Sequence, residues 1–84
     1  MASVRHDYEM ITSRQIRAAR AMLGWSRQDL ADRAIISIST VRRMEEGETN
    51  HRLNSIECTQ KILEEAGIEF SFKGDDGVRL LPKL

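Results

Sequence analysis

The stretch Ser26–Glu46 has the sequence SRQDLADRAIISISTVRRMEE, and it holds two short helical patterns separated by a tight break. In the first pattern, Ser26 followed three residues later by Asp29 is a capping box, which predicts the start of a helix. The apolar positions that follow recur on one helical face and are Leu30, Ala31 and Ala34. We therefore predict a first helix that is held by a small apolar stripe.

The second pattern begins at Ser37, which together with Thr40 predicts another N-cap. The helix that follows carries Val41, Met44 and Glu45 on one face and Ser39, Arg42, Arg43 and Glu46 on the opposite face. A helix with a small apolar face, followed by one that presents short polar and guanidinium groups outward, is typical of a helix-turn-helix that contacts DNA.

Residues 24–47, GWSRQDLADRAIISISTVRRMEEG, closely resemble the helix-turn-helix of the lambda repressor, Cro and xenobiotic-response-element (XRE) regulators of bacteria and phages. The resemblance runs without a gap from about Ile11 to Gly47 and continues more loosely through LEEAGIEF. It implies a mainly α, four-helix lambda-repressor-like domain that binds double-stranded DNA. It also implies a homodimeric transcriptional regulator on an inverted-repeat operator, and a looser similarity to small controller proteins implies either repression or activation.

The composition favours one small domain whose core needs help from a partner chain. The net charge is zero, but residues 13–43 carry seven arginines against two aspartates, and residues 44–84 carry nine acidic against five basic residues. This polarity favours a nucleic-acid surface in the first half, although solvated charged faces are the alternative. One cysteine, Cys58, and no evident signal peptide or long apolar run lead us to expect a cytoplasmic protein without a membrane partner.

Capping signals also define a helix before the motif. Thr12 and Gln15 form a capping box, and Gly24 is a natural C-cap, so we predict a helix over residues 13–23. Residues 1–11 show no clean period, and we interpret them as a flexible leader.

Two charged residues lie on predicted apolar faces. Arg20 lies between Ile16 and Leu23 on the inward face of the first helix, and Glu45 lies on the apolar face of the helix that begins after Ser37. A charge in such a place requires a partner, so we predict a bidentate Arg20–Glu45 ion pair between these helices, as the resemblance also implies. The alternative is that both side chains extend separately to solvent.

The turn of the motif departs from the family pattern. Ile35 occupies the position where the family usually has glycine. A left-handed backbone is costly for a β-branched residue, so the turn is either reshaped or strained.

A fourth helix and a hairpin complete the prediction. Asn54 and Glu57 form a further capping box and predict a helix over residues 55–66 that ends at Gly67, so the DNA-binding domain is residues 12–67. Residues 68–84 then alternate with period two around the turn KGDDG and predict a β-hairpin.

An isolated hairpin is marginal in water, so its apolar residues need a surface to cover. We expect that surface to belong to a second chain, which makes the hairpin a dimerisation element. The residues assigned to this contact are Ile68, Phe70, Phe72, Val78 and Leu80. The alternative is a hairpin folded onto its own domain.

The resemblance implies that Ile38, Ser39 and Arg43 lie at base-reading positions. Arg43 suits a bidentate contact to guanine O6 and N7, and Ser39 can donate or accept a hydrogen bond. Ile38 has no polar side-chain atoms, so it either contacts a thymine methyl group or turns inward to pack. Arg42 can reach a base or a phosphate.

Phosphate contacts are expected at the start of the first helix of the motif, from Ser26 and Arg27, because free N–H groups there favour an anion. The family usually has glutamine at the Arg27 position. Secondary candidates for phosphate contact are Thr40, Asn50 and Arg52.

The sequence leaves two other function classes to compare with a DNA-binding regulator. A protein-interaction module, such as an antitoxin or antiactivator, could use the same fold with its acidic C-terminal half or hairpin edge as the binding surface. Catalysis is disfavoured because His6, His51 and Cys58 have no partners at motif spacing. We therefore expect no enzyme activity, no metal, no cofactor and no small-molecule ligand.

Overall fold

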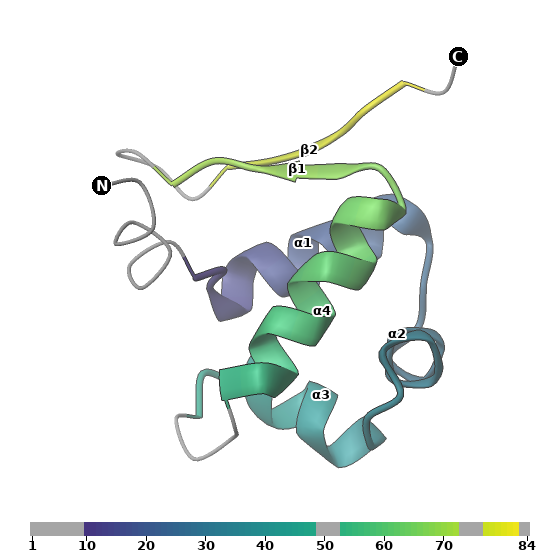
Figure 1. Cartoon of the computed structure of the whole chain (residues 1–84), viewed down its shortest axis with the longest axis vertical. Coiled ribbons are helices and arrows are strands. Elements are labelled where there is room, and N and C mark those ends of the chain that lie inside the picture. Colours follow the sequence, from purple (N-terminus) through teal and green to yellow (C-terminus); the bar gives the residue numbers. More distant parts are fainter. Residues whose placement is uncertain (1–9, 49–52, 73–76, 83–84) are drawn as a thin grey trace.

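The computed structural model describes residues 10–48, 53–72 and 77–82. It contains the helices α1 (Ser13–Leu23), α2 (Arg27–Ala34), α3 (Ile38–Glu45) and α4 (Leu53–Glu65), and the strands β1 (Ile68–Phe70) and β2 (Val78–Leu80). Figure 1 shows α4 crossing α1, with the hairpin over α1 at one end of the molecule and α3 at the other. The predicted fold, four helices followed by an antiparallel hairpin, is confirmed.

Local capping explains where the helices of the motif begin. The Ser26 main-chain N–H donates to the Asp29 carboxylate at 2.9 Å, and the Asp29 N–H donates to Ser26 Oγ at 3.0 Å, which completes the predicted capping box of α2. The Ser26 hydrogen bonds lower the pKa of Asp29 below its ordinary value of 3.8. At the start of α3, Ser37 Oγ accepts the Thr40 N–H at 3.1 Å, as predicted.

The predicted start of the fourth helix is wrong. α4 begins at Leu53, so Asn54 lies within its first turn and cannot be its N-cap. A capping preference is a local signal and shifts easily by one or two residues, whereas the periodic stripe that fixes the buried face does not. The buried face of α4 includes Thr59 and Leu63, which are both fully buried.

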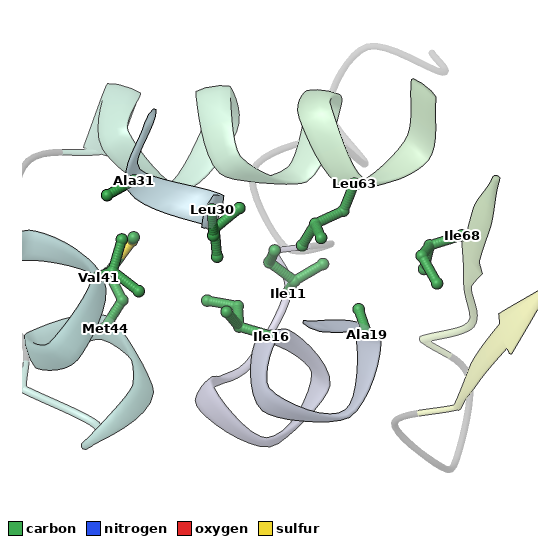
Figure 2. Close-up of a cluster of buried hydrophobic side chains, with 9 residues drawn as sticks. All are labelled: Ile11, Ile16, Ala19, Leu30, Ala31, Val41, Met44, Leu63 and Ile68. Carbon is green, nitrogen blue, oxygen red and sulfur yellow. The ribbon is translucent and has the colours of Figure 1, made fainter. Parts of the chain in front are cut away.

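The core lies between the four helices and the first strand. Figure 2 shows its side chains converging from α1, α2, α3, α4 and β1. Its apolar members are Ile11, Ile16, Ala19, Leu30, Ala31, Val41, Met44, Leu63 and Ile68. Ile11, which the sequence interpretation assigned to the leader, is therefore a core residue, and the folded domain includes it. The rest of the predicted leader, residues 1–9, lies outside the described residues.

The hairpin packs against its own domain. β1 and β2 pair antiparallel, with Ile68 opposite Leu80 and Phe70 opposite Val78. Ile68 is only 2% exposed, and Phe70, Phe72 and Val78 are partly buried against the same core. In this chain Ile68, which the sequence assigned to a contact with a second chain, is covered by the chain's own helices, as in the alternative of a hairpin folded onto its own domain. The KGDDG turn lies mostly outside the described residues.

A buried glutamine joins the hairpin to α1. The Gln15 side chain is fully buried, and its Nε2 donates to the main-chain oxygens of Ser71 at 3.0 Å and Gly77 at 3.1 Å. Its Oε1 accepts the Thr12 N–H at 2.9 Å. One amide therefore completes the cap of α1 and satisfies both ends of the loop that connects the strands.

We expect Gln15→Glu to lower the free energy of unfolding by about 2–3 kcal/mol at neutral pH, because a carboxylate cannot donate to the two carbonyl oxygens. Protonation restores one donor, so the loss should shrink as the pH is lowered. Urea denaturation at several pH values measures both effects. The control is Gln28→Glu, an exposed glutamine that donates to Asp32, which should cost less than about 0.5 kcal/mol. Equal losses in the two variants would contradict the role of Gln15.

The turn between α2 and α3 is strained. Ile35 has φ 56° and ψ 51° in the left-handed region, and its side chain is 89% exposed. The strain of a β-branched residue in this conformation is therefore not offset by burial. Of the two outcomes that the sequence left open, the strained turn is the one observed.

We expect Ile35→Gly to raise the free energy of unfolding by about 1 kcal/mol, since glycine adopts this conformation without steric cost. For a domain of this size such a gain corresponds to a rise in Tm of about 4–8 °C, measured by thermal denaturation. Gly24→Ala is the matched reverse change, because Gly24 has φ 69° at the end of α1 and an added Cβ there meets no atom within 4 Å. It should lower Tm. A lower Tm for Ile35→Gly would show that contacts hold Ile35 in place.

Candidate nucleic-acid interface

α3 has one buried face and one outward face. Val41, Met44 and Glu45 are buried, whereas Arg42 and Arg43 are exposed. The outward stripe follows helical spacing and consists of Ile38, Ser39, Arg42 and Arg43. The structure thus brings all four predicted base-reading residues together on one surface of α3.

Ile38 is the first residue of α3, and its side chain is 42% exposed. Of the two alternatives for Ile38, the inward-packed one is therefore not observed. A hydrocarbon side chain at the exposed start of a helix, four and five residues before Arg42 and Arg43, presents an apolar contact beside hydrogen-bond donors. In a major groove such a pair would match a thymine methyl group next to a guanine edge.

Glu45 holds α3 in place through a group of arginines. Its carboxylate is buried, with Oε2 at 2.7 Å from Arg20 Nε and Oε1 at 3.1 Å from Arg20 Nη2. This is the bidentate contact predicted from the two misplaced charges. Arg27 Nε donates to Glu45 Oε1 at 3.0 Å, and Arg17 Nη1 donates to the Glu45 main-chain oxygen. We call these four residues the Glu45 cluster.

The Glu45 cluster links three helices. Arg17 and Arg20 come from α1, Arg27 from the first position of α2, and Glu45 from the end of α3. Arg20 also donates through Nη1 to the Trp25 main-chain oxygen at 3.0 Å, which fixes the connection between α1 and α2. Charged hydrogen bonds to a buried carboxylate restrict the geometry of all three helices, so the cluster determines how the outward face of α3 is presented.

The role of Arg27 in this cluster was missed by the sequence interpretation, which assigned it only to phosphate. A signal was present. Arg27 precedes Leu30, Ala31 and Ala34 by three, four and seven residues, so it lies at the start of the buried stripe of α2.

Of the other residues predicted to contact phosphate, two already have hydrogen-bond partners and two lie outside the described residues. Ser26 is exposed at the start of α2, but the carboxylate of Asp29 accepts its N–H, and this negative charge disfavours a phosphate in the same position. Thr40 Oγ1 lies 2.9 Å from Ser37 Oγ and is already hydrogen-bonded within the cap of α3. Asn50 and Arg52 lie outside the described residues.

Within residues 10–48, 53–72 and 77–82, no group of three or more His, Cys, Asp or Glu residues could hold a metal ion. None of the helices in these segments is long and apolar enough to cross a membrane.

Comparison with known protein families agrees with this geometry. Residues 16–54 match the helix-turn-helix family, which covers α1 from Ile16, both helices of the motif and the start of α4. A search of the curated proteins gave no match to the chain. The matched segment contains the whole Glu45 cluster and the outward stripe of α3. Residues 16–54 thus match the helix-turn-helix family of XRE and lambda-repressor-like DNA-binding regulators.

Proposed function

We propose that this protein is a homodimeric, sequence-specific transcriptional regulator that acts in the cytoplasm on an inverted-repeat operator. Each α3 lies in a major groove, and the two half-sites are about 34 Å apart, one turn of the DNA helix. The observation that carries this proposal is the outward stripe of α3, held in position from behind by the buried Glu45 cluster.

The roles within the stripe follow from side-chain chemistry. Arg43 donates two hydrogen bonds to guanine, and Ser39 donates to or accepts from a neighbouring base edge. Ile38 contacts a thymine methyl group, and Arg42 contacts either a base or the backbone. The half-site therefore contains a guanine with a thymine close by.

Backbone contacts position the domain without reading sequence. Arg27 contributes through the terminal nitrogens of its guanidinium, since its Nε is bound to Glu45. Asn50 and Arg52 are the further candidates, whereas the Asp29 carboxylate disfavours a phosphate at Ser26, and Thr40 is hydrogen-bonded to Ser37. Whether the bound protein represses or activates depends on where the operator lies relative to the promoter.

Selection of the purified protein against a random pool of duplex DNA at near-physiological salt tests the proposal. The expected result is an enriched palindrome whose half-sites contain guanine and thymine. Recovery of no sequence, with only weak binding that salt abolishes, would contradict the proposal and favour the protein-interaction alternative.

A further inference from the structure

A hollow of about 460 Å³ lies where the end of α1, the last turn of α2, the end of α4 and strand β2 meet. The partly buried residues Leu23, Trp25 and Ala66 line it, and none of the residues that line it comes from α3. Figure 1 shows the hairpin and α3 at opposite ends of the molecule, so an occupant near β2 leaves the outward stripe of α3 accessible.

Two large apolar side chains of this hollow are exposed. Met22 is 46% exposed and Leu80 is 43% exposed, and both line the same hollow. We call this surface the Met22–Leu80 hollow. Exposed apolar side chains that gather around a depression, with charged residues beside them, are typical of a protein interaction site.

The charged residues beside the hollow are of opposite sign. Arg33 stacks over the Trp25 ring, with its guanidinium carbon 4.4 Å from the ring centroid, and Glu65 at the end of α4 lines the same hollow. Among the described residues, neither Arg33 nor Glu65 forms an ion pair. An apolar surface that also carries one cation and one anion can meet a second copy of itself about a twofold axis, with each cation paired to the partner's anion.

We infer that a second copy of this chain docks on the Met22–Leu80 hollow about a twofold axis. Arg33 then pairs with Glu65 of the partner subunit, and Met22 and Leu80 are covered at the centre. The inference rests on the proposed function in that it supplies the interface of the proposed homodimer. It also replaces the inner face of the hairpin as the contact: Ile68 is used by the chain's own core, while Leu80, opposite it in the strand pairing, stays exposed.

Reciprocal charge reversal tests the inference. The variants R33E and E65R, each alone, place like charges opposite each other at both ends of the interface, so each should be monomeric at micromolar concentrations where the wild type is dimeric. An equimolar mixture should recover dimers, because the heterodimer pairs opposite charges at both contacts. Sedimentation equilibrium without DNA measures all three samples, and circular dichroism confirms that each variant is folded.

Two further variants fix the location. L80E should also abolish the dimer, whereas E57R, the same charge change on the same helix outside the hollow, should leave it intact. A mixture of R33E and E65R that stays monomeric, or a wild type that is monomeric both free and on DNA, would overturn the inference. Selection of a single half-site by a monomer would leave the DNA-binding proposal standing. A dimer that forms through the hollow but enriches no DNA sequence would support the interface and contradict the DNA-binding proposal.

Discussion

Glu45→Gln should lower the free energy of unfolding by about 3 kcal/mol, the largest loss expected from a single isosteric change in this protein. The change removes the negative charge that faces Arg20 and Arg27, and the amide can no longer accept their hydrogen bonds at both of its terminal atoms. The figure lies at the low end of the range for broken buried ion pairs, because Arg20 and Arg27 are partly exposed and water can solvate them. Urea denaturation measures the change.

The matched control is Glu69→Gln, which removes the same charge from the Glu69–Arg79 ion pair of the hairpin. Both of those side chains are largely exposed, so the expected loss is below about 1 kcal/mol. Equal losses in the two variants would show that the Glu45 cluster contributes no more than a surface ion pair. A large loss for Glu45→Gln alone would establish that the cluster holds α1, α2 and α3 together.

The sequence could predict this cluster only in part. Arg20 and Glu45 were paired because each lies on an apolar helical face, and a charge there has few stable arrangements. Arg27 was not assigned to Glu45, because a cation next to an N-cap is equally suited to contact a DNA phosphate. The sequence alone does not decide between these two anionic partners. Only the packing of α2 against α3 brings its Nε to 3.0 Å from Glu45.

The errors at the ends of the domain have a common physical origin. The capping box at Asn54 and the leader that included Ile11 were both inferred from local patterns, whereas the structure at these points depends on long-range packing. The same holds for the hairpin. Its alternating residues predict two strands, but alternation alone cannot say whether Ile68 is covered by this chain or by another. Gln15, a polar residue that donates to Ser71 and Gly77, connects the hairpin to its own domain.

The turn at Ile35 departs from the family pattern, and its conformation shows how strongly the rest of the motif determines the path of the chain. Because Ile35 replaces glycine, the sequence left two outcomes open, and the left-handed, exposed isoleucine selects one. The motif keeps its geometry even where the residue disfavours it, since the packing of Leu30, Ala31 and Val41 and the hydrogen bonds of Glu45 over-determine the path of the chain.

Arg43→Ala should weaken binding to the selected operator by about 5–150-fold while leaving binding to unrelated DNA nearly unchanged. This range corresponds to the roughly 1–3 kcal/mol by which a bidentate arginine–guanine contact discriminates against other bases. Competition titrations of the operator, and of variants with each base in turn at the guanine position, measure the effect. The Arg43→Ala variant should no longer distinguish bases at the guanine position, and it should keep its base preferences at the other positions of the operator.

Substitutions of two other arginines serve as controls that distinguish the loss of a base contact from the loss of a positive charge. Arg14→Ala removes the same charge from an exposed position of α1 outside the outward stripe, so it should leave the order of preference among operator variants unaltered. Arg27→Ala should weaken binding to all sequences alike and reduce the slope of log K against log salt by about one unit. Since Arg27 also binds Glu45, its titration must be made well below the Tm of the variant. If Arg43→Ala produced the same uniform loss as Arg27→Ala, α3 would contact the DNA backbone through Arg43, and the base-reading role would fall to Ser39, Ile38 or Arg42.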